Sequence, residues 1–100
     1  MTDSTDLTTL QPRFDLGNVV ATSGALEALD RAGLAPALFL ARHQCGDWGD
    51  LGEDDRAENE FSLGRYLRLF SAYDLDDGTT IWIITEADRS STTILLPDEY

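Results

Sequence analysis

The chain has 100 residues, 42% of them hydrophobic, with a formal net charge of −12 and a pI near 4.1. This length predicts one domain, and the apolar fraction allows a modest core, which excludes a chain that is disordered throughout. A surface this negative repels phosphates and anionic lipids. We therefore expect no direct binding to nucleic acid or to a membrane.

The composition also predicts the bounds of the domain and the cellular compartment of the protein. Residues 1–12 are polar and predict a flexible N-terminal tail, followed by a single compact domain over residues 13–100. The sequence has no apolar run of bilayer length, no signal-peptide pattern, and only one cysteine, Cys45. All seven basic residues are arginine, a usage typical of GC-rich bacterial genomes. We therefore expect a cytoplasmic protein of a bacterial host cell.

A first helix is predicted over residues 24–32. A hydroxyl of Thr22 or Ser23 can cap its start, and Gly33 can adopt the left-handed conformation that ends a helix. Leu26 and Leu29 are expected to share its buried face.

A second helix is predicted over residues 36–44, because Pro36 suits a first helical position and Gly46 stops the pattern. A third is predicted over residues 53–62, with acids in the first turn, where the helix dipole favours them. Ala57 and Phe61 give this third helix a narrow apolar edge, and its other residues are expected to face water or a partner.

From residue 65 the pattern alternates with a period of two, which predicts a strand with one face more buried than the other. The two alternating sets are Leu67, Leu69, Ser71, Tyr73 and Leu75 on one face, and Tyr66, Arg68, Phe70, Ala72 and Asp74 on the other. A turn at 76–78 leads to a β-branched strand over 79–85, and a second turn leads to a strand over 92–96. The predicted fold is α+β. About three short helices pack on one face of a three-stranded antiparallel meander, and residues 14–21 form either a short extra N-terminal strand or an extended lead-in.

Catalytic groups are sparse. His43 is the only histidine, expected on the surface at a helix end, and Cys45 lies about 200° from it around that helix, so the two cannot act as a pair. The many carboxylates lie among glycines and polar residues, which does not favour the desolvation that acid–base catalysis needs. We expect no enzyme activity.

Calcium is the more serious alternative, because residues 74–78 resemble the start of a calcium loop. The glycine, however, is at the fifth place and Thr85 at the twelfth, so the EF-hand pattern fails and a hairpin turn explains the segment. We expect no cofactor and no metal. An enzyme or metal-dependent protein would instead show a higher melting temperature with calcium or magnesium.

The two tryptophans fit different roles. Trp82 lies within a predicted strand and is expected in the core. Trp48 lies among acids and glycines, where it is either a plug under the third helix or an exposed anchor for a partner.

The most unusual stretch is acidic. Residues 47–62 contain seven acids and one arginine, a balance of −6 out of −12. Carboxylates held in an ordered array can compete with DNA for a phosphate-binding surface, because such surfaces place Lys and Arg at the spacing of phosphates. The candidate partner-binding residues are Asp47, Asp50, Glu53, Asp54, Asp55, Glu58, Glu60, Asp74, Asp76 and Asp77.

Three stretches, residues 21–26, 46–51 and 83–97, resemble a family of small proteins carried on plasmids and other mobile elements. The resemblance covers nearly the whole chain after residue 13. The chain also resembles acidic anti-CRISPR proteins of the type I class, most similar to inhibitors of type I-C systems. This resemblance implies a monomeric DNA mimic that binds a basic, Cas8-like subunit of the effector complex (Cascade) and blocks recognition of target DNA and its protospacer-adjacent motif. An antitoxin-like or plasmid-housekeeping protein that neutralises another basic protein is the alternative.

Overall fold

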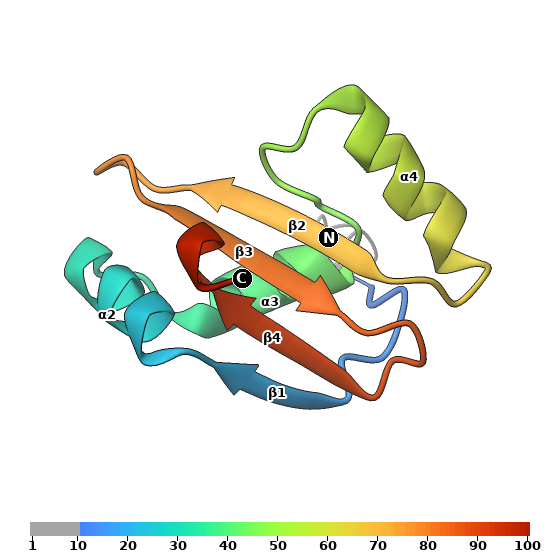
Figure 1. The fold of residues 1–100 in the computed structure, drawn as a ribbon, viewed down its shortest axis with the longest axis horizontal. Helices are drawn as coiled ribbons and strands as arrows, with labels where there is room; N and C mark the ends of the chain where they lie inside the picture. Colours follow the sequence, from blue (N-terminus) through green and yellow to red (C-terminus); the bar gives the residue numbers. More distant parts are fainter. Residues whose placement is uncertain (1–10) are drawn as a thin grey trace, which may run out of the picture.

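In the computed structural model, residues 11–100 are described, and they form one sheet with three α-helices (Figure 1). In chain order the elements are β1 (Asn18–Ala21), α2 (Ser23–Ala32), α3 (Pro36–Gln44), α4 (Glu53–Leu63), β2 (Leu69–Asp74), β3 (Thr80–Thr85), β4 (Ser91–Leu95) and the 3-10 helix η1 (Pro97–Glu99). The predicted α+β fold is confirmed. Residues 1–10 of the predicted tail lie outside the described part of the chain.

The sheet has the strand order β1-β4-β3-β2. The predicted antiparallel meander is present as β2, β3 and β4, and Gly78, at a φ of 91°, provides the turn between β2 and β3. β1 adds to the open edge of β4 in parallel, with Asn18 opposite Ser91. The sheet is therefore mixed, and the meander alone is antiparallel.

α2 and α3 cover one face of the sheet and close the main core. Ala25, Ala28 and Leu29 of α2 pack with Phe39 of α3 over the sheet residues Tyr73, Ile81, Ile83 and Ile94. The predicted ends of α2 are confirmed, since Thr22 accepts a hydrogen bond from the amide of Ala25 at 3.1 Å and Gly33 adopts a φ of 72°.

The prediction for Leu26 is wrong, because this side chain is 44% exposed. Positions 25, 28 and 29 repeat at helical spacing and form the inward stripe of α2. Leu26 is one residue from Ala25, and a step of about 100° turns it away from the sheet.

The prediction that His43 lies on the surface is also wrong. The imidazole is fully buried under the sheet, with Nδ1 2.5 Å from Ser71 Oγ and Nε2 2.9 Å from Thr85 Oγ1. Strands β2 and β3 point small hydroxyl side chains at this spot, which leaves room for the ring and satisfies both of its nitrogens.

The opposite face of the sheet carries a smaller aromatic cluster. Trp82 is half-buried there, and its ring meets those of Phe70 at 5.0 Å and Tyr100 at 5.9 Å, both edge to face. In Figure 1, η1 lies in front of the sheet and α3 behind it. The prediction that Trp82 lies in the core is therefore wrong, because its ring packs in this second, partly exposed cluster.

Candidate functional site

α4 lies along the outer edge of β2, to the upper right in Figure 1. The side-chain amide of Asn59, on α4, makes the two hydrogen bonds that a neighbouring strand would make to β2. Nδ2 donates to the carbonyl of Phe70 at 2.6 Å, and Oδ1 accepts from the amide of Phe70 at 3.0 Å. An edge strand otherwise presents unpaired amides and carbonyls to solvent. Asn59 therefore docks α4 and satisfies part of this edge.

The loop before α4 completes the cover of the same edge. The amide of Ala72 donates to the carbonyl of Trp48 at 3.3 Å, and the carbonyl of Ala72 accepts from the amide of Asp50 at 2.7 Å. The Asp50 carboxylate accepts from the amide of Asp74 at 2.8 Å. Asp50 therefore supports the fold, and the structure places it beside Asp74.

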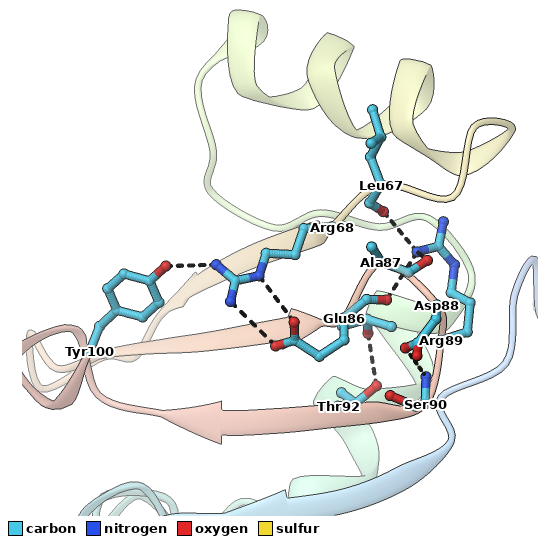
Figure 2. Close-up of polar contacts among 10 residues, drawn as sticks. Leu67, Arg68, Glu86, Ala87, Asp88, Arg89, Ser90, Thr92 and Tyr100 are labelled. Atoms are coloured by element: carbon cyan, nitrogen blue, oxygen red, sulfur yellow. Dashed lines mark hydrogen bonds and ion pairs between the residues drawn. The ribbon is translucent and has the colours of Figure 1, made fainter.

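The C-terminal end of α4 is held by Arg89, which is only 8% exposed. Its guanidinium donates to carbonyls in the segment before β2 and in the β3–β4 turn (Figure 2). It also donates to carbonyls at the end of α4. These carbonyls belong to Ser62 at 3.3 Å, Leu63 at 3.4 Å, Leu67 at 2.7 Å, Glu86 at 3.2 Å and Ala87 at 3.0 Å. A cation at a helix C-terminus also suits the helix dipole. Arg89 thus joins three segments and fixes the direction of α4.

Trp48 plugs the space between α4 and the domain. It is 4% exposed, and its indole N–H donates to Glu60 at 3.0 Å. Of the two alternatives left open for Trp48, the structure shows the plug under α4.

Two of the ten candidate acids are paired within the molecule. Glu60 accepts two hydrogen bonds from Arg13, at 2.9 and 3.0 Å, and this pairing, with the Trp48 bond, lowers the pKa of Glu60. Asp47 accepts from Arg42 Nε at 2.7 Å and from the amide of Gly49 at 3.2 Å, and both contacts lower its pKa. These acids offer less charge to a partner than their number suggests.

Five candidate acids make no side-chain hydrogen bond or ion pair with the described residues: Asp76 in the β2–β3 turn, and four acids of α4. The four acids of α4 are exposed and lie on its first half, and we call them the α4 acidic face: Glu53, Asp54, Asp55 and Glu58. Three of them occupy the first turn, where the positive end of the helix dipole stabilises negative charge. The structure therefore brings together the centre of the predicted site.

Asp76 and Asp77 lie in a separate place, and Asp74 lies between them and Asp50. Asp76 and Asp77 lie in the β2–β3 turn, at the left tip of the sheet in Figure 1, whereas α4 lies to the right. Asp77 accepts from the amide of Thr79 at 3.0 Å, which lowers its pKa, and Asp74 accepts from Thr80 Oγ1 at 2.9 Å. Their hydrogen bonds are those of a hairpin turn.

α4 turns polar side chains inward and apolar ones outward. Its buried residues are Asn59 and Ser62, while Ala57 is exposed and Phe61 is 49% exposed. The apolar edge predicted for this helix therefore faces solvent, and the expectation that the other residues all face water or a partner is wrong. The reason is that this helix docks through backbone groups of β2 and through Arg89, both of which need polar partners.

Open grooves flank this apolar edge on both sides. A groove of about 440 Å³ runs between α4 and the 46–49 loop, and another of about 430 Å³ is lined by Asp54, Ala57, Glu58 and Phe61. Ala57 lines both. The surface is continuous from the loop across α4 to Phe61.

Groups suited to catalysis or metal binding do not converge in the described residues. His43 is enclosed by Ser71 and Thr85, and no cluster of three or more His, Cys, Asp or Glu residues in 11–100 could hold a metal ion. Within the same residues, no helix is both long and apolar enough to cross a bilayer.

Comparison with protein-family models, with curated proteins and with solved structures gives no match. The function is therefore argued from the site itself.

Sequence reasoning missed three residues that define this site, namely Asn59, Phe61 as an exposed group, and Arg89. For Asn59 a weak signal exists, because asparagine is a poor helix former in the middle of a helix and indicates a specific contact. Arg89 lies in a polar turn, and its carbonyl partners outside that turn, on Ser62, Leu63 and Leu67, become neighbours only through the fold.

Proposed function

We propose that the protein acts in the bacterial cytoplasm as an acidic DNA mimic, and that it inhibits a type I CRISPR effector complex (Cascade). In this proposal the α4 acidic face binds the basic surface of a Cas8-like subunit where the target duplex and its protospacer-adjacent motif dock. The observation that carries the proposal is a rigidly docked helix whose exposed carboxylates have no partner among the described residues.

The density of charge on α4 supports mimicry. From residue 53 to residue 58 the helix rises about 7.5 Å, five steps of about 1.5 Å, and carries four carboxylates and Arg56. The net charge is one per about 2.5 Å, while duplex DNA carries one per about 1.7 Å along its axis. A surface built to bind phosphates would meet a comparable field here.

Order matters as much as charge. Holding a carboxylate array on a docked helix avoids the entropy that a flexible acidic tail would lose on binding. Asn59, in the second half of α4, and Arg89, at its C-terminal end, supply that order. Several charge-assisted contacts can then add up, where single exposed pairs contribute little.

A competition assay tests the proposal. Purified type I-C effector is mixed with labelled duplex containing the protospacer-adjacent motif, and the protein is titrated in. We expect displacement of the duplex. Unchanged duplex binding at large excess of the protein would refute the proposal, and a pull-down that recovers a toxin or regulator would favour the antitoxin-like alternative.

Charge reversal locates the site. Asp54→Lys, Asp55→Lys and Glu58→Lys together should weaken competition at least about tenfold, more so at low salt, because exposed charges are screened less there. The matched control reverses three exposed acids elsewhere, Glu27, Asp30 and Asp98, and should compete much more like the wild type. Equal losses in both variants would mean that net charge matters and that α4 is not the site.

A further inference from the structure

Phe61 is an exposed aromatic residue inside an acidic surface, on a helix that does not use it for packing. Asn59 is buried, and it lies two residues from both Ala57 and Phe61, hence about 200° round the helix from each. The docking of α4 through Asn59 therefore turns the Phe61 side chain away from the sheet.

The surroundings of Phe61 combine apolar and acidic groups. The groove beside it is lined by Ala57 and Phe61 together with Asp54 and Glu58, so carboxylates border the apolar strip. The guanidinium of Arg65 lies 3.9 Å from the centre of the Phe61 ring, and its Nη1 donates to the Phe61 carbonyl at 3.1 Å. The ring thus already accepts one arginine by cation–π stacking.

Resting on the proposed function, we propose that the Ala57–Phe61 strip is the anchor of the interface. Its occupant is an apolar side chain of the basic partner protein, flanked by arginine or lysine residues that pair with Asp54 and Glu58. Charge complementarity selects this occupant, because a purely apolar segment would leave the carboxylates unpaired, and a second copy of this chain would bring another charge of −12.

An apolar anchor gives the protein an advantage over DNA. Duplex binding to a basic surface weakens steeply with salt, because it depends on counterion release. Burial of an aromatic ring depends little on salt, and buried aromatic residues are frequent hot spots of protein interfaces. The protein would therefore compete more effectively with the duplex as the salt concentration rises.

The test measures competition by Phe61→Ala at several salt concentrations, with the effector and duplex described above. We expect the apparent Kd of the protein for the effector to rise at least about tenfold at every salt concentration. The dependence of log Kd on log salt concentration, which we call the salt slope, should be unchanged. Phe61→Leu should retain most of the affinity. Asp54→Asn with Glu58→Gln should instead flatten the salt slope.

The control is Leu38→Ala on α3, since Leu38 is also 49% exposed but lies on a helix that covers the sheet face. It should compete like the wild type, and circular dichroism should show that each variant is folded. If the wild type displaces the duplex and Phe61→Ala does so equally well, the anchor is refuted and the proposed function stands. If the wild type fails to displace the duplex, both are refuted.

Discussion

At the scale of single residues, His43 shows how a buried chain of hydrogen bonds fixes a protonation state. Thr92 Oγ1 donates to the carbonyl of Leu16 at 2.7 Å, so Thr85 must donate to Thr92, at 2.8 Å. Thr85 then accepts from His43 Nε2–H, and the bare Nδ1 accepts from Ser71. A proton on Nδ1 would break this order, so the network requires a neutral imidazole.

This network predicts a pH dependence of stability. Burial, with a smaller contribution from the charge of Arg89, lowers the pKa of His43 from 6.5 to about 3. Between these pH values the unfolded chain binds a proton that the folded chain excludes. The free energy of unfolding should therefore fall by up to about 1.4 kcal/mol per pH unit as the pH drops below 6.5, and this loss should level off near pH 3.

Urea unfolding between pH 5 and 6.5 measures this slope, because the ordinary pKa values of Asp and Glu lie below that window. His43→Gln keeps hydrogen-bonding capacity but cannot take up the proton. It should lower the stability at pH 7 and flatten the slope. Equal slopes for the two proteins would contradict the buried neutral imidazole.

Neither His43 nor Arg89 could be placed from the sequence. A histidine in the last turn of a helix commonly lies on the surface, where the helix dipole favours its charged form. The burial of His43 depends on Ser71 and Thr85, which lie 28 and 42 residues further along the chain. By contrast, Thr22 and Gly33 act within their own helix, and their roles were predicted correctly.

At the scale of elements, α4 is docked by polar contacts in place of an apolar face. Replacing Asn59 with leucine should leave the amide and carbonyl of Phe70 unpaired at the edge of β2. Each such group costs about 1–3 kcal/mol when it is buried. We expect a loss of about 2–4 kcal/mol in the free energy of unfolding, together with faster hydrogen exchange in α4 than in β3.

The control for this substitution is Asn18→Ala, at the exposed start of β1, which should change the stability by less than about 0.5 kcal/mol. Amide exchange followed by mass spectrometry locates the opening. If Asn59→Leu left the protection of α4 and of the Phe70 amide unchanged, Asn59 would not be the docking residue.

Element types were predictable because local signals agree with the fold. The β-branched run at 79–85, the turn glycines, and Pro36 at the start of α3 act within a few residues, and the structure places their elements within about two residues of the predicted bounds. The position of α4 was not predictable in this way. Its apolar edge suggested packing, whereas the open edge of β2, which Asn59 satisfies, exists only in the assembled sheet.

At the scale of the whole molecule, a charge of −12 opposes folding by self-repulsion, and α4 concentrates part of that cost. Asp54 and Glu58 are four residues apart on one side of the helix, an arrangement of like charges that destabilises by about 0.2–0.5 kcal/mol. The first-turn acids recover some of this through the helix dipole. The acidic face is therefore a feature that the fold tolerates and that binding would explain.

Salt should consequently act in opposite directions on the fold and on the complex. Raising NaCl from about 20 to about 200 mM screens repulsion within the molecule, so the Tm should rise by a few degrees, while the same screening weakens attraction to a basic partner. Thermal melts followed by circular dichroism at pH 7.5 measure the first effect, and direct titration of the effector with the protein, in the absence of duplex, measures the second.

The matched variant neutralises the α4 acidic face with Glu53→Gln, Asp54→Asn, Asp55→Asn and Glu58→Gln, which changes the net charge from −12 to −8. Its Tm should depend less on salt than that of the wild type, and its competition should be weak at every salt concentration. A Tm that falls with salt in the wild type would mean that favourable ion pairs, such as Arg13 with Glu60, outweigh the repulsion. The repulsion within the α4 acidic face would then not measurably destabilise the fold, and no binding role would be needed to explain why these carboxylates are present.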